Sequence, residues 1–209
     1  MSFQINDLGL ISYSKAYTLQ KEAVENLIAG GRQVLFLCEH PAVITLGRMS
    51  RQEHILFSKQ ELQKRGIEIV SIDRGGDVTL HAPGQIVAYP IFNLLEYGKD
   101  LHAFLFKLEQ VAIDLLADFG IVANRISGRT GVWAGEKKIV SIGIGVRKWI
   151  SFHGLGLNVN TDLKLFSVIK PCGLDVAMTS MAELRRQPIE IAEVKAKLIK
   201  CFEKKFNNE

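Results

Sequence analysis

The sequence of residues 131–160 is GVWAGEKKIVSIGIGVRKWISFHGLGLNVN, and it indicates how this part of the chain folds. It contains apolar runs of strand type at 131–134, 137–146 and 151–160, joined by tight turns. Strands that follow one another across short turns favour antiparallel pairing. We therefore expect an antiparallel sheet here.

Glycines recur with a period of two in the last two of these strands, at Gly143 and Gly145 and again at Gly154 and Gly156. Successive side chains of a strand alternate between its faces, so each pair lies on one face. Because glycine weakens a strand, the repeat suggests room for a ligand or for another backbone. A barrel-like bend of the sheet explains it equally well.

The rest of the chain alternates between helical and strand patterns. We expect helices over 14–31, 58–66, 100–120 and 188–206, and strands over 33–39, 42–47, 67–72, 77–81 and 85–92. No repeat, low-complexity segment or linker interrupts them. The sequence therefore predicts an α+β fold, with mixed, largely antiparallel sheets flanked by helices, as a single domain over 1–209.

Composition narrows the functional classes. Apolar residues make up 47% of the chain and charged residues 23%, as in an ordinary globular protein. No apolar run reaches the roughly 18 residues of a membrane span, and the N-terminus lacks a secretory pattern, so we expect a cytoplasmic protein. The net charge of +4 is spread along the chain; we expect no nucleic-acid binding, although the charge would attract an acidic protein.

The segment RGGDVTLHAPGQ, Arg74 to Gln85, combines groups that suit a binding site. Arg74 supplies a fixed cation and His81 an imidazole, while Gly75 and Gly76 allow a backbone to approach closely. A hairpin in which the glycines merely turn the chain is the alternative. The segment lacks the Gly-Lys-Ser/Thr ending of a phosphate-binding P-loop.

Cys172 lies between Pro171 and Gly173, in a pattern typical of a loop, where a thiol is hard to bury. Cys38 and Cys201 lie in apolar patterns and are expected in the core. Three scattered cysteines do not make a disulfide framework. Lys138 would stabilise a Cys172 thiolate if the two met, although a lysine at such a position usually faces solvent.

These motifs together resemble one family, the octanoyltransferases of lipoate biosynthesis, which are related in fold to biotin and lipoate protein ligases. The match is carried by HPAVITLGR, RGGDVTLHAPGQ, GRTGVWAGEKKIVSIGIGV with SFHGLGLNVN, and IKPCGL, in the family's order. They run from His40 to Leu174, about two thirds of the chain.

The resemblance implies roles for particular residues. Cys172 would carry the acyl group, and Lys138 would lower the pKa of its thiol and move protons. His153 is a candidate beside the thioester. The residues implied to line the acyl site are Arg74, Gly75, Gly76, Asp77, Val78, Thr79, Leu80, His81, Ser141, Ile142, Gly143, Gly154, Leu155 and Gly156.

The implied reaction moves an octanoyl or lipoyl group from acyl carrier protein to a lysine ε-amine, through a cysteine thioester. The implied acceptors are the lipoyl domains of 2-oxoacid dehydrogenases and the H protein of glycine cleavage. Neither ATP nor a metal is expected, and a monomer is expected. The chain departs from the family's usual pattern at Ile44, Leu80 and Ala82, which bear on the shape of the acyl pocket.

Three other functions fit parts of the pattern. An ATP-dependent lipoate or biotin ligase would share the fold, but it has no use for a thioester cysteine. A cysteine hydrolase could pair Cys172 with His81 or His153. A non-catalytic binding module would have no reason to keep both Cys172 and Lys138.

Overall fold

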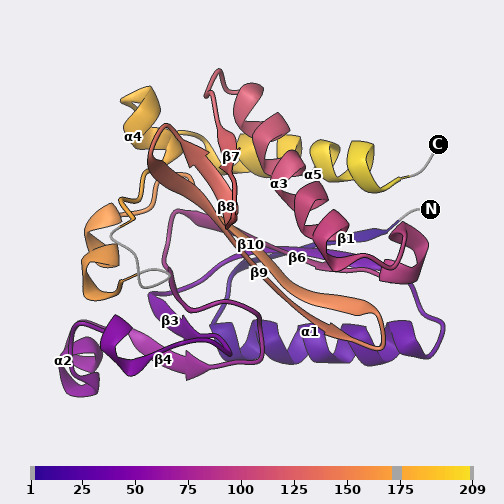
Figure 1. Ribbon diagram of the computed structural model, residues 1–209, viewed down its shortest axis with the longest axis horizontal. Coiled ribbons are helices and arrows are strands. Elements are labelled where there is room, and N and C mark those ends of the chain that lie inside the picture. Colours follow the sequence, from indigo (N-terminus) through magenta and orange to yellow (C-terminus); the bar gives the residue numbers. More distant parts are fainter. Residues whose placement is uncertain (1–2, 171–175, 208–209) are drawn as a thin grey trace.

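The computed structural model describes residues 3–170 and 176–207 (Figure 1). The strands are β1 Gln4–Leu10, β2 Val34–Glu39, β3 Val43–Leu46, β4 Glu68–Ser71, β5 Val78–His81, β6 Gln85–Ile91, β7 Asn124–Ile126, β8 Arg129–Ala134, β9 Lys137–Arg147 and β10 Ile150–Asn158. The α-helices are α1 Tyr13–Ile28, α2 Lys59–Lys64, α3 Leu101–Ala117, α4 Met181–Arg185 and α5 Ile191–Phe206. Short 3₁₀ helices are η1 Gln52–His54, η2 Leu94–Tyr97 and η3 Leu163–Val168.

The strands form two sheets. The larger has seven strands in the order β1-β2-β6-β10-β9-β8-β7, and the smaller has the order β4-β3-β5. β1 pairs with β2 and β3 with β4 in parallel, whereas the other pairs are antiparallel. The expected α+β class with mixed, largely antiparallel sheets is therefore confirmed, and the stretch 131–160 supplies three adjacent strands.

Strands β1 and β7 and helix α4 were not expected from the sequence. β1 is mostly exposed and lies at the edge of the large sheet, so its residues show no apolar alternation. Helix α4 is only five residues long and is capped by Ser180, whose hydroxyl accepts from the Glu183 amide. Such short or edge elements are set by pairing and capping rather than by apolar periodicity.

Helices cover both faces of the large sheet (Figure 1). α3 and α5 pack on one face, around fully buried aromatic side chains that include Phe92, Phe104 and Phe206. α1 packs on the opposite face, against β6 and β10. Each face of the large sheet therefore packs against its helices around a separate apolar cluster.

The small sheet packs with α2 and η3 around a third apolar cluster. It contacts the large sheet beyond the end of β8, where the edge of β9 is open: the Gly75 amide donates to the Ile144 carbonyl at 2.8 Å. Ile44, Leu80 and Ala82, the departures from the family pattern, are all fully buried in this third cluster.

The period-two glycines are explained by close approach of the protein's own groups. A Cβ at Gly154 would collide with the Ala88 carbonyl oxygen of β6, and one at Gly145 with the ring of Phe152. A Cβ at Gly143 would come within 3.0 Å of the Gly75 carbonyl oxygen. The glycines therefore let strands and loops approach closely. Of the explanations that the sequence left open, the approach of another backbone is the one observed at Gly143 and Gly154.

Candidate functional site

Two adjoining cavities lie where the small sheet meets the open edge of β9. One is a cleft of about 890 Å³ and the other an inner cavity of about 40 Å³. The residues that line both are Arg74, Thr79, Ser141, Ile142 and Gly143. The segment 74–79 and the strand β9 therefore form a common wall between the two.

The cleft collects most of the residues that the sequence singled out. Its lining includes Gly75, Gly76, Asp77, Val78 and Lys138, besides the shared residues. The lining residues that the sequence did not mark are Met49, Arg51, His54, Leu105, Gly128, Arg129, Thr130, Trp133 and Val176, and Ile144 of β9 lines the cleft as well. The cleft thus combines apolar walls with two cationic side chains that are themselves buried, Arg74 and Lys138.

Lys138 is held at the cleft by its backbone and its surroundings. Its amide donates to the Ala177 carbonyl at 2.8 Å, and its own carbonyl accepts from Thr179 at 2.9 Å. The side chain is 5% exposed, and its Nζ lies 5.2 Å from the centroid of the Trp133 ring. The absence of a side chain at Gly131 leaves space for the lysine stem. The lysine therefore does not face solvent.

Cys172 lies outside the described residues, but the chain on either side of it is fixed at the cleft. The Lys170 amide donates to the His54 carbonyl at 2.8 Å, and Ile169 pairs with Ile55. On the other side, Val176 lines the cleft and Ala177 bonds to Lys138. Residues 169 and 170 are therefore joined to the segment that supplies His54 to the cleft, and residue 176 lines the cleft itself.

Arg74 is a fixed cation, as expected. Its Nη2 donates to the Thr45 carbonyl at 2.8 Å, its Nε to the Thr45 hydroxyl at 3.2 Å, and its Nη1 to the Gly75 carbonyl at 3.0 Å. Gly76 has φ of +84°, a conformation that favours glycine. The Gly-Gly pair therefore wraps the backbone around the guanidinium.

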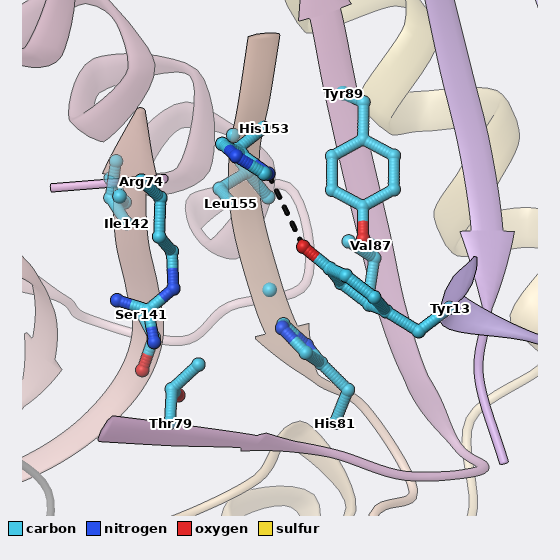
Figure 2. A pocket seen from close by; sticks show the side chains of 13 residues that line it. Tyr13, Arg74, Thr79, His81, Val87, Tyr89, Ser141, Ile142, His153 and Leu155 are labelled. Carbon is cyan, nitrogen blue, oxygen red and sulfur yellow. Dashed lines mark hydrogen bonds between the residues drawn. The ribbon is translucent and has the colours of Figure 1, made fainter. Parts of the chain in front are cut away.

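The inner cavity is lined by aromatic and imidazole side chains that Figure 2 shows facing one another. Tyr13 comes from α1, His81 from β5, Tyr89 from β6 and His153 from β10. The remaining lining residues are Val87, Gly154, Leu155 and Gly156. The expected residues of the glycine-rich strands thus meet tyrosines that no sequence motif had marked.

His81 is a neutral imidazole in this cavity. Its Nδ1 lies 2.6 Å from Gln85 Oε1, and the Gln85 amide nitrogen donates to Asn158 Oδ1 at 2.8 Å. Gln85 therefore presents an acceptor, so His81 Nδ1 carries the proton and Nε2 a lone pair. Burial, above all, lowers the pKa of His81 to about 3.

His153 takes part in a second polar chain. Its Nε2 lies 2.9 Å from Asp73 Oδ1, and its Nδ1 lies 3.3 Å from the Tyr13 hydroxyl (Figure 2). The hydrogen bond from His153, opposed in part by burial, lowers the pKa of Asp73 to about 2. His153 has φ of +57°, an uncommon conformation for a non-glycine residue, and its amide donates to the Gln20 side chain at 2.7 Å.

Two expected features lie away from the cavities. Leu80 is buried in the core of the small sheet and lines neither of them. Cys38 and Cys201 are buried, as the sequence predicted. Burial raises the pKa of the Cys38 thiol far above its ordinary value and that of Cys201 to about 11. Neither thiol is therefore ionised near neutral pH.

Within residues 3–170 and 176–207, the structure contains no group of three or more His, Cys, Asp or Glu side chains placed to hold a metal ion. A separate property concerns membranes: among the described helices none is long and apolar enough to cross one.

Comparison with known proteins places this geometry in a family. The lipoyl protein ligase A/B catalytic domain matches residues 12–203. The chain belongs to this family. It is 45% identical over 202 residues to an octanoyltransferase of Syntrophotalea carbinolica, covering 96% of this chain and 92% of the relative. It is also 45% identical over 210 residues to an octanoyltransferase of Caldicellulosiruptor saccharolyticus, covering 99% and 89%.

Solved structures show the same fold at low sequence identity. A lipoate-protein ligase A bound with ATP superposes with a TM-score of 0.79 at 18% identity, covering 99% of this chain and 86% of the other. A biotin protein ligase from Aquifex aeolicus gives a TM-score of 0.57 at 15% identity, covering 99% and 70%. The fold expected from the resemblance is thus confirmed, and the sequence relatives support an acyltransferase.

Proposed function

We propose that this acyltransferase moves an octanoyl group onto a lysine ε-amine in protein lipoylation, by way of a thioester on Cys172. The observation that carries the proposal is the buried Lys138 on the wall of the cleft, bonded through its backbone to residues 177 and 179, just beyond the cysteine turn. An ammonium close to a thiol favours the thiolate, the form that attacks an acyl donor.

The chemistry divides into two steps. The thiolate attacks the donor thioester, a new C–S bond forms and the donor thiol leaves. The acceptor amine then attacks the Cys172 thioester, a C–N bond forms and the cysteine sulfur leaves. In the first step Lys138 takes the proton from the thiol, and the resulting ammonium stabilises the thiolate and then protonates the departing donor sulfur. In the second step Lys138 takes a proton from the attacking amine and passes it to the cysteine sulfur as that sulfur leaves.

The cleft supplies a place for the acyl chain. Ile142, Ile144 and Leu105 offer apolar walls in a volume of about 890 Å³. An eight-carbon chain can bury about six methylenes at roughly 0.8 kcal/mol each, which gives about 5 kcal/mol of binding. Recognition of the chain therefore needs no polar contact to its tail.

The proposed donor is octanoyl-acyl carrier protein, and the proposed acceptors are lipoyl domains and the glycine cleavage H protein, met in the cytoplasm. Arg51 and Arg129 are exposed and line the cleft, which suits an acidic carrier. Exchange of one thioester for another is nearly balanced and amide formation runs downhill, so the proposal requires no ATP. The likeness to ATP-bound ligases concerns the fold alone.

Intact-mass spectrometry after incubation with octanoyl-acyl carrier protein tests the proposal. We expect the wild type to gain one octanoyl group that hydroxylamine removes. C172S should gain none and should lose transfer, whereas C38S and C201S should acylate as the wild type does. A hydroxylamine-sensitive adduct that persists in C172S would contradict the proposal.

A further inference from the structure

The cleft contains a buried carboxylate whose hydrogen bonding is incomplete. Asp77 is only 8% exposed and lines the cleft together with His54. Its Oδ2 lies 2.6 Å from His54 Nδ1. Its Oδ1 is buried and has no hydrogen-bond partner among the described residues. Buried charged oxygens are nearly always paired, so this atom is suited to accept a donor from a bound molecule.

The pair is joined to the segment that precedes the proposed acyl carrier in the chain. The carbonyl of His54 accepts from the Lys170 amide at 2.8 Å, and Lys170 precedes Cys172 by two residues. Leu56, two residues after His54, bonds to the Val168 carbonyl at 2.9 Å. The segment that bears the imidazole is therefore joined to the segment that leads into the cysteine turn.

The charges of the cleft decide which substrate group fits Asp77. Arg74 and Lys138 are buried cations on its walls and would attract an anionic group of the substrate, whereas the Asp77 carboxylate would repel one. The complement of a carboxylate oxygen that has no hydrogen-bond partner is instead a cationic N–H donor. Among the groups that the proposed reaction brings together, the lysine amine of the acceptor has this chemistry.

We propose that Asp77 and His54 form the receiving site for the acceptor lysine, which deepens the proposed function and rests on it. Asp77 Oδ1 accepts an N–H of the incoming ammonium, and His54 takes one proton from it, so that a neutral amine attacks the Cys172 thioester. The imidazolium that results is stabilised by Asp77. The second amine proton leaves after the C–N bond forms and goes to the departing sulfur by way of Lys138.

Other charged groups surround His54. Glu53 Oε1 lies 3.8 Å from its Nε2, and Arg51 lies 3.5 Å from Glu53. Lys138 and Arg74 line the same cleft. Glu53 is 69% exposed and does not line the cleft, so E53Q is a matched control for D77N: each removes one carboxylate near the same imidazole.

The test separates the two half-reactions. In D77N, acylation of Cys172 by octanoyl-acyl carrier protein should stay near the wild-type rate, whereas single-turnover transfer to a lipoyl domain should fall about 100-fold, the order of a general-base contribution. Higher pH, which supplies neutral lysine, should restore part of the loss. E53Q should behave as the wild type in both steps, and D77E should recover part of the transfer.

Hydroxylamine provides the decisive comparison, because it is neutral near pH 7 and needs no proton acceptor. It should release octanoyl hydroxamate from acylated D77N as fast as from the acylated wild type. Equal slowing of hydroxylamine and of the lipoyl domain would mean that Asp77 only supports the thioester, and would overturn the proposal. So would unchanged transfer in D77N, which would mean that water alone fills the site. A wild type that forms no thioester refutes the proposed function and this site with it.

Discussion

The two faces of the large sheet are built from the same strands but for different purposes. In β6, Ile86 and Ala88 face the apolar cluster beneath α3 and α5, whereas Val87 and Tyr89 face α1 and the inner cavity. The first face carries a continuous apolar core. The second face carries a smaller apolar cluster beneath α1 and, where it meets the small sheet, polar side chains are buried, among them His153 of β10 and His81 of β5.

The difference between the two faces shows where the fold accepts the unfavourable free energy of burying polar groups in order to form a functional site. Apolar side chains packed beneath α3 and α5 stabilise the chain in proportion to the surface that they bury. Buried imidazoles and cations destabilise the folded chain unless each has a hydrogen-bond or ionic partner. Such groups are concentrated at functional sites. Mutations on the first face should therefore change stability, and mutations at the cleft should change rates.

The largest effect is expected at the cleft. Lys138→Met removes the ammonium but keeps the length of the stem that lies between Gly131 and Trp133. Loss of the proton-transfer group should lower kcat/KM for octanoyl transfer about 1,000-fold, or roughly 4 kcal/mol. Alkylation of Cys172 by iodoacetamide should move to higher pH in the variant. An unchanged alkylation curve would show that the two groups do not interact.

The residues of the two cavities show which parts of the site could be predicted from the sequence. Lys138, Arg74 and His81 were recognised because each lies in a contiguous sequence motif. Residues that are neighbours in the sequence stay close together in the folded chain, so such motifs can be read without the structure. Tyr13 and His54 were missed because each enters its cavity alone, from α1 or η1, through contacts with residues far away in the chain. The glycine repeat left a ligand, another backbone and a bend of the sheet open as explanations, and only the sheet register shows that the Ala88 backbone is the group that approaches Gly154.

On the face covered by α3 and α5, a large effect on stability rather than on the transfer rate is expected. Phe206 is fully buried and its ring lies 5.1 Å from that of Phe92 and 5.6 Å from that of Phe104. Phe206→Ala should lower the free energy of unfolding by about 3–5 kcal/mol. Octanoyl transfer per folded molecule should be unchanged. Phe106→Ala on α3, where the side chain is 55% exposed, is the control and should cost much less in urea titration.

The inner cavity should make the protein sensitive to acid. The pKa of His81 is lowered from 6.5 to about 3 in the folded state, so the unfolded chain binds the proton more readily. Its contribution to stability is complete above about pH 6.5 and is lost as the pH falls toward 3. Between these values the free energy of unfolding should fall by about 1.4 kcal/mol per pH unit because of this group alone.

Urea titrations of the wild type and of His81→Gln across this range check that slope. The difference between the two proteins should shrink as the pH falls. His102→Gln, which replaces an exposed imidazole on α3, serves as the control. A difference that stays constant with pH would mean that His81 is protonated alike in the folded and unfolded chains.

The smallest effect concerns the helix that bridges the two regions. α3 begins at the cap residue Asp100, whose carboxylate accepts from the amides of His102 at 2.8 Å and Ala103 at 3.1 Å, and farther along Leu105 lines the cleft. Asp100→Ala should lower the free energy of unfolding by about 1 kcal/mol, while Asp100→Asn, which keeps an acceptor oxygen, should cost less. If α3 serves chiefly as part of the core, the transfer rate should not change in either variant. A fall in kcat/KM without a fall in stability would instead show that the start of α3 positions the wall of the cleft, and the division between the two regions would have to be redrawn there.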